Sequence, residues 1–355
     1  MFGPKYQLGL DIGNSSVKAV VIDKKNSDML ISKIGVAVIP EGTVAGGKVI
    51  RPDLLTKSIK EAVLEAGGKV KNVCFTVHHQ NVIIRHLTLP PMEEAEIQEA
   101  LKWELKNNIP FTGKAVYDFQ VLEKNIENVN ILLAAVEETI ALDYCGCIKE
   151  AGLIPSAIDI QPLAFARLIN MLAERGRLDT ELQNNWEQDT VMLIDLSEHC
   201  TSLSFFTLRK LNFFRVISFG GSELSAILAQ NLGVSAKNAE KLLSQYGLFE
   251  NPYYGAEQIG ELKSALHKFL QEIKRSIKFF QVQHPDYDVS GAVLAGEVSG
   301  LRGLEDVLGD ELTITIKVLN PFPAFKAIPD IEPKVSEYGN TLSLGLGLAV
   351  REVGP

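Results

Sequence analysis

One short pattern occurs twice in this chain and constrains its fold more than any other feature. An apolar run that ends around Asp11-Ile12 is followed by the small residues 13–16 and a second apolar run, and a similar order recurs at Asp195 with residues 197–202. Two β-rich runs joined by a few small polar residues predict a β-hairpin. Two such hairpins, one in each half of the chain, indicate an α/β fold built from two related domains.

The remaining runs predict alternating strands and helices, with residues 82–151 forming a small α+β unit inserted into the first domain. We expect residues 174–189, which are polar, to be a linker or loop. The expected strands are residues 6–12, 17–23, 36–39, 73–77, 82–89, 116–122, 129–136, 157–160, 191–196, 203–208, 213–218, 292–294 and 314–318. The expected helices are residues 52–66, 92–108, 138–151, 162–172, 236–246, 257–283, 301–308 and 342–350.

Composition limits the classes of partner. The 355 residues carry a formal net charge of -9, and an acidic surface repels phosphate backbones, so we expect no nucleic-acid partner. No uncharged apolar run is long enough to span a bilayer, and residues 351–355 carry no amphipathic tail, so we expect neither a transmembrane helix nor an amphipathic membrane anchor. The four cysteines include no CxxC pair, which indicates reduced thiols. His78 and His79 are adjacent in a strand, so their side chains point to opposite faces and we do not expect them to bind one metal ion together.

The first hairpin tip has the chemistry of an anion site. Small residues present backbone N–H groups and hydroxyls, and Lys18 can offset the charge of a phosphate while Asp11 holds Mg²⁺ through water. An ordinary hairpin turn rich in Gly, Asn and Ser remains the alternative. The candidate residues are Asp11, Gly13, Asn14, Ser15, Ser16 and Lys18.

Two further elements match this chemistry in the second half. Asp195 (a second Mg²⁺ candidate, again through water), Ser197 and Thr201 lie in the second hairpin, which can clamp phosphates from the other side of a cleft. Gly296, Glu297 and Val298 follow a strand and precede a helix, a context that can hold a nucleoside, although a plain turn fits as well. His199 is a weak candidate for a catalytic role, and the catalytic residues stay unknown.

In this order, the three elements resemble the actin-like ATPase superfamily over nearly the whole chain. The resemblance implies the two-domain, ribonuclease H-like α/β fold, two phosphate loops at 11–18 and 195–202, an adenosine loop at 296–298 and ATP with Mg²⁺ as ligand. It also implies two helices that connect the domains, at 158–169 and 340–350.

The insert narrows the resemblance to one branch. Residues 89–92, 100–104, 108–111 and 118–121, with 219–221 and 239–240 after them, resemble the PilM family of type IV pilus assembly proteins, which shares subdomain 1C with the cell-division protein FtsA. The resemblance adds Gly220, Gly221 and Glu240 to the nucleotide site. It implies a cytoplasmic scaffold at the inner face of the bacterial cytoplasmic membrane that captures the N-terminal cytoplasmic peptide of PilN, near subdomains 1A and 1C. Its implied subdomains are 1A (1–82 and 155–188), 1C (83–154), 2A (189–225 and 286–355) and 2B (226–285).

The chain departs from the family pattern at Ser197 and Glu297, where Gly is usual, and at Leu243, where Lys is usual. Losing a cation and adding an anion beside the nucleotide predict binding weaker than in the family, or its loss.

Trp103, Ile109 and Phe111 are candidates for the partner groove, because aromatic anchors are common in peptide sites; the alternative is that they form the core of the insert.

Two other functions remain open at this level. A small-molecule kinase of the same superfamily would phosphorylate an acceptor, and a filament protein like FtsA would polymerise with ATP. We expect at most a slow ATPase, because hydrolysis needs a residue that positions water near the γ-phosphate.

Overall fold

The computed structural model describes residues 6–25, 28–77, 82–108, 111, 113–250, 252 and 254–351. Among these residues the chain divides into two compact units, one with residues 6–21 and 33–161 and the other with residues 22–32 and 162–351. Strands β2 (Ser16–Lys25) and β3 (Asp28–Val38) run from one unit into the other. Two large sheets and one small sheet account for most strands, as the repeated hairpins predict.

The first sheet has six strands in the order β10-β6-β1-β2-β3-β16, and β6 pairs in parallel with both β1 and β10. Its apolar face is covered by helices α1 (Pro52–Glu65) and α3 (Glu138–Glu150), whose buried side chains share one cluster with those of β1 and β2. Gly35 lets α1 approach β3, because a Cβ there would lie 1.9 Å from the carbonyl oxygen of Ala62. The remaining bounds are β1 Tyr6–Ile12, β4 Val44–Ala45, β5 Lys48–Val49, β6 Asn72–Thr76, β10 Ile154–Asp159 and β16 Lys326–Ala327.

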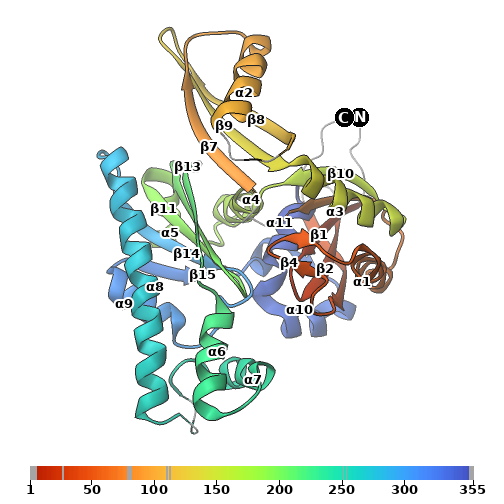
Figure 1. Ribbon diagram of the computed structural model, residues 1–355, viewed down its shortest axis with the longest axis vertical. Helices are drawn as coiled ribbons and strands as arrows, with labels where there is room; N and C mark the ends of the chain where they lie inside the picture. The colour runs from red at the N-terminus through yellow and green to blue at the C-terminus, as the bar shows by residue number, and fades with distance from the viewer. Residues whose placement is uncertain are drawn as a thin grey trace. The chain divides into compact units, whose positions relative to one another are not determined.

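The insert forms a separate antiparallel sheet of β7 (Val82–Leu89), β9 (Val129–Glu137) and β8 (Ala115–Lys124), with α2 (Glu94–Asn108) across one face (Figure 1). Ile97 and Leu101 of α2 pack there on Ile131 and Leu133 of the central strand. The helix at 138–150, expected in this unit, packs instead with the core of the first sheet. The residue bounds of the four subdomains stay predictions.

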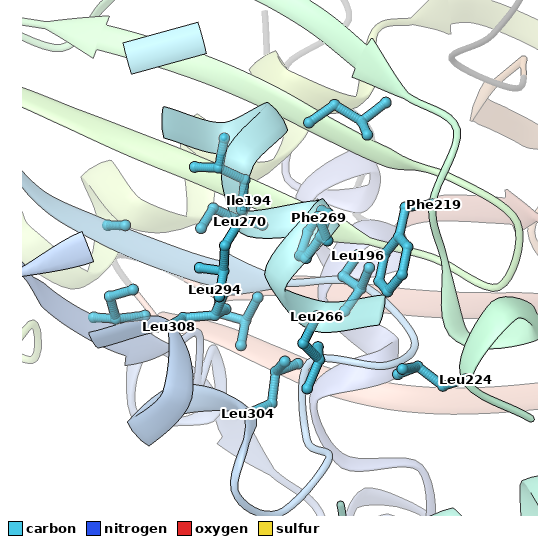
Figure 2. Packing of buried hydrophobic residues seen from close by; sticks show 14 of the residues in the cluster. Ile194, Leu196, Phe219, Leu224, Leu266, Phe269, Leu270, Leu294, Leu304 and Leu308 are labelled. Carbon is cyan, nitrogen blue, oxygen red and sulfur yellow. The ribbon is translucent and has the colours of Figure 1, made fainter. Parts of the chain in front are cut away.

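The second unit is built on a five-stranded sheet in the order β13-β12-β11-β14-β15. Every residue of β11 and β12 is buried, because helices cover both faces of these central strands. Figure 2 shows Ile194, Leu196 and Leu294 of the sheet meeting side chains of the 28-residue helix α8 and of α9. The bounds are β11 Thr190–Leu196, β12 Thr201–Thr207, β13 Lys210–Ile217, β14 Val289–Ala295, β15 Thr315–Val318, α8 Ala256–Gln283 and α9 Leu304–Leu312.

Residues 174–189 are not the linker that their polarity predicts, since they contain helix α5 (Thr180–Gln188). Asp179 caps it by accepting hydrogen bonds from the N–H groups of Glu181 and Leu182. Leu182 and Trp186, one turn apart, are its buried residues, and Trp186 Nε1 donates to Asn170 Oδ1 at 2.8 Å. Two apolar residues make too narrow a stripe for periodicity to detect.

The two helices expected to connect the domains, α4 (Gln161–Glu174) and α11 (Ser343–Ala349), pack closely on each other. A Cβ on Gly347 would lie 2.3 Å from the carbonyl oxygen of Ala164, and Arg167 Nε donates to the carbonyl of Gly347 at 3.1 Å. The other helices are α6 Gly221–Leu232, α7 Ala236–Tyr246, the unpredicted α10 Glu332–Tyr338 and the short 3₁₀ helices η2 Phe322–Ala324, η3 Pro329–Ile331 and η4 Gly339–Leu342. Across the described residues, none of the helices has the length and apolarity that crossing a membrane requires.

Candidate nucleotide site

The first hairpin forms as predicted. The N–H of Gly13 donates to the carbonyl of Ser16 at 2.9 Å and closes the turn between β1 and β2. Ser15 lies exposed at the tip, while Asn14 and Ser16 are half-buried. Beneath the tip, Lys18 Nζ lies 3.3 Å from Asp11 Oδ2, and both residues are buried. A buried cation and its carboxylate partner therefore lie directly under a turn of small polar residues.

The second hairpin repeats this geometry at the same offsets from its aspartate. The N–H of Ser197, two residues after Asp195, donates to the carbonyl of Cys200 at 3.0 Å. In the first hairpin the N–H of Gly13, two residues after Asp11, donates to the carbonyl of Ser16 in the same way. β11 and β12 pair antiparallel, and Thr201 Oγ1 donates to the carbonyl of Phe219 at 2.7 Å. Asp195 is buried at 2% exposure. The internal repeat predicted from sequence thus extends to the hydrogen bond that closes each turn.

The start of helix α6 is joined to this second loop. The N–H groups of Gly221 and Ser222 donate to the carbonyls of Ser197 (3.1 Å) and Glu198 (2.7 Å), and the N–H of Gly220 donates to Glu223 Oε2 at 2.8 Å. A Cβ on Gly220 would lie 2.4 Å from the Glu198 carbonyl oxygen, so glycine is needed for this approach. A helix N-terminus is a common anion site, but here its first N–H groups hold the loop in place.

The adenosine-loop candidate completes the cluster. Gly296 has a φ of 95°, and a Cβ there would lie 2.4 Å from the Leu196 carbonyl oxygen and 2.5 Å from Asp195 Oδ1. The N–H of Val298 donates to the carbonyl of Leu196 at 3.1 Å, and the Val298 side chain lies against Gly221. The structure therefore brings three separate sequence segments of the second unit into one site. Glu297 lies half-buried between its two anchored neighbours.

Two candidates on helix α7 differ in placement. Glu240 is exposed. Leu243, where the family pattern has Lys, is 5% exposed and packs in the core with Ala239, one turn earlier. A lysine at this place would bring an ammonium group into apolar packing, so the departure at Leu243 fits the local core.

The three candidates for the partner groove, all in the insert, also differ in their exposure to solvent. Trp103 is 64% exposed on α2, so it is not a core residue of the insert. Phe111 packs, partly buried, against the core of the small sheet. Ile109 lies outside the described residues. Among these, only Trp103 offers a large aromatic surface to a partner.

The histidines give little support for catalysis or metal binding. His199 is exposed in the second loop, with Nδ1 3.2 Å from Ser222 Oγ. His78 and His79 lie outside the described residues. Within the described parts of the chain, no cluster of three or more His, Cys, Asp or Glu residues forms a metal site, and the four cysteines are free thiols.

Sequence reasoning missed Glu223. Its carboxylate accepts from the N–H of Gly220 and, at 3.1 Å, from Ser222 Oγ, so it fixes the start of α6 beside the second loop. The signal was present, because a Glu three residues after an N-cap position is typical of a capping box.

Comparison with known proteins matches residues 9–353 to the family model described as "Type IV pilus assembly protein PilM". The structure of a "PilM-PilN type IV pilus biogenesis complex" resembles this chain with a TM-score of 0.85 and 27% identity, covering 98% of this chain and 99% of that one.

More distant matches agree on the fold. MreB5 of Spiroplasma citri bound to ADP superposes with a TM-score of 0.52 at 12% identity, covering 97% of this chain and 95% of that one. The cell division protein FtsA of Staphylococcus epidermidis (strain ATCC 35984) is 20% identical over 95% of this chain and 79% of its own length. The predicted two-domain actin-like fold with an inserted small subdomain is confirmed.

Proposed function

Because the chain belongs to the PilM family of type IV pilus assembly proteins, we propose that it is a scaffold of the pilus assembly platform which binds the cytoplasmic N-terminal peptide of a PilN protein. The observation that carries this proposal is the likeness, at a TM-score of 0.85 over 98% of the chain, to a PilM-PilN complex. Such a scaffold works in the cytoplasm, at the inner face of the membrane, and reaches the bilayer through its partner.

Trp103 supplies a reporter for this interaction. The chain has two tryptophans, and the other, Trp186, is completely buried, so solvent-sensitive emission comes from Trp103. Titration with a synthetic PilN N-terminal peptide is expected to shift that emission to shorter wavelength if the peptide covers α2. A tryptophan at the centre of an interface contributes 2 kcal/mol or more, so Trp103→Ala is expected to weaken binding about thirtyfold.

Phe279→Ala is the matched control, because Phe279 is another exposed aromatic residue (51%), in the second unit. Unchanged peptide affinity in Trp103→Ala, measured by calorimetry, would remove Trp103 from the partner groove. Absence of peptide binding to the wild-type chain would contradict the scaffold function itself.

The second part of the proposal is that Mg²⁺-ATP binds at the two hairpins. The residues fit the group, because Lys18 is buried beneath the first tip and the Gly296 loop approaches Asp195 so closely that no Cβ fits between them. In this proposal Asn14, Ser15 and Ser16 of the first hairpin and Ser197 of the second would face the phosphates, and Gly296, Glu297 and Val298 would face the nucleoside. Thr201 is not a contact residue, because it is completely buried and its hydroxyl donates to the Phe219 carbonyl. Asp11 and Asp195 would hold Mg²⁺ through water. The bound ion and triphosphate supply a strong charge that can bias the domain arrangement.

We further propose that the affinity is lower than the family norm and that hydrolysis is slow at most. Two observations support the lower affinity: the first N–H groups of α6 are engaged with loop carbonyls and with Glu223, and the Lys of the family pattern is the buried Leu243. Calorimetric titration with ATP, with and without Mg²⁺, tests it. A submicromolar dissociation constant would contradict the weakened site, and no binding at all would leave a purely structural adaptor.

A further inference from the structure

A pocket of about 670 Å³ lies in the second unit, and its lining contains none of the residues assigned to nucleotide or PilN, although Phe219 and Glu223 adjoin Gly220 and Gly221. The end of strand β13 and helices α6 and α8 form its walls. Phe219 and Phe269 are stacked in its lining with ring centroids 4.4 Å apart, joined by Ile217, Ile227 and Ala265. Pockets of this size with an apolar lining are typical of binding sites rather than packing defects.

The polar lining carries unbalanced negative charge. Glu272 is neutralised by Arg215 at 2.8 Å and by Arg275. Glu223 and Glu261 also line the pocket, and within the described residues neither forms an ion pair. Glu223 bonds to the neutral donors Gly220 N and Ser222 Oγ, which leaves its charge in place.

Among the described residues that line the pocket, Lys268 is the one lysine or arginine. It lies seven residues along α8 from Glu261, roughly 10 Å at 1.5 Å per residue. The pocket is therefore acidic at its Glu223–Glu261 end.

The pocket also touches the end of an edge strand. β13 is the end strand of the five-stranded sheet, so no strand in the described part of the chain pairs with its outer side, and its last residue, Ile217, lines the pocket. An extended peptide can add to such an edge through main-chain hydrogen bonds and place alternate side chains into an adjoining pocket.

We propose that this pocket is a second protein-docking site, which takes an extended segment with an apolar side chain next to a lysine or arginine. The apolar side chain fills the space over Phe219 and Phe269. The cationic group lies between Glu223 and Glu261. The β13 edge sets the direction of the segment. The pocket shares Glu223 with the start of α6, where its carboxylate accepts from the Gly220 N–H, and it contains neither the two hairpin turns nor Trp103.

The test uses the full chain and a fluorescently labelled, amidated peptide in which leucine alternates with lysine. Anisotropy is expected to show saturable binding. Glu261→Lys, which reverses one pocket charge, and Ala226→Phe, which fills the pocket from the exposed side of α6, are each expected to weaken it at least tenfold. Ala226 lines the pocket and is exposed, so the larger side chain leaves the core intact.

Glu257→Lys is the matched control, since Glu257 is exposed one turn before Glu261 on α8 and outside the pocket lining. It is expected to keep wild-type affinity, and a leucine–glutamate peptide is expected to bind at least tenfold more weakly. Equal weakening by Glu257→Lys and Glu261→Lys would overturn the proposal, because binding would then follow the net charge of -9 alone. A dimer in sedimentation that Ala226→Phe dissociates would also overturn it, since a second copy would then fill the pocket.

Discussion

The two hairpins have the same turn and different surroundings. In each hairpin, the residue two positions after the aspartate donates its backbone N–H to the carbonyl of the residue three positions further on. That acceptor is Ser16 in the first hairpin and Cys200 in the second. The first hairpin has Lys18 seven residues after its aspartate, and the second has Ser202 there. Asp11 thus has a cationic neighbour on its own hairpin, whereas the second loop is braced by backbone contacts from α6 and from the Gly296 loop. One hairpin is organised by a buried charge pair, the other by close backbone packing.

The largest expected effect is at the buried ion pair. Lys18→Met leaves the Asp11 carboxylate buried without its cation, and breaking such a pair by removing one partner costs about 3–5 kcal/mol of unfolding free energy. Urea denaturation measures it. Lys57→Met is the control, because Lys57 and Glu61 are 74% and 55% exposed, and the loss there is expected to be below about 1 kcal/mol. Similar losses in the two variants would show that the buried pair of the first hairpin contributes no more than an exposed pair.

Next in size is the backbone approach at the second hairpin. Gly296→Ala forces a Cβ within 2.5 Å of Asp195 Oδ1 and holds a non-glycine residue at a φ of 95°. We expect a loss of about 2–3 kcal/mol, from strain and displaced packing. Gly300→Ala is the control in the same loop, because a Cβ there meets nothing within 4 Å. A Gly296→Ala protein as stable as Gly300→Ala in thermal and urea unfolding would show that the loop adapts freely.

A smaller change makes the second hairpin more like the first. Thr201 lies six residues after Asp195, and the matching residue after Asp11 is Val17. Thr201→Val removes the 2.7 Å hydrogen bond to the buried Phe219 carbonyl and is expected to cost about 1–2 kcal/mol. Val17→Thr, the reciprocal variant, places a hydroxyl in an apolar cluster. If Thr201→Val is neutral in urea unfolding, this hydrogen bond does not brace the loop.

The smallest expected effect is at Ser197, the place of a glycine in the family pattern. Its φ is not in the left-handed region, so the backbone does not require glycine there. Ser197→Gly is expected to lower the free energy of unfolding by less than about 1 kcal/mol, through greater freedom of the unfolded chain. A stabilised Ser197→Gly protein would instead indicate that the serine side chain strains the loop.

Much of the architecture could be read from local patterns. Both hairpins, the insert sheet with its helix, and α7 and α8 follow from alternation, periodicity and small polar turns, which are local properties of the chain. Helix α5 could not be found this way, because its stability rests on the burial of Leu182 and Trp186 against segments distant in sequence. The packing of α3 on the first sheet's core also depends on residues far from it along the chain.

The candidate site also has some features that follow from the local sequence and others that depend on long-range packing. The two aspartate hairpins follow from the sequence alone, because turn chemistry is a local property of the chain. The glycines at 220, 221 and 296 are visible in the sequence, but each is needed because of a close approach to a distant segment. Tertiary packing, in contrast, sets the hydrogen bonds by which the N–H groups of α6 hold the second loop, the burial of Leu243 and the exposure of Trp103. Hydrogen-bond partners and burial are set by what long-range packing brings alongside a residue, and no local pattern in the sequence contains that information.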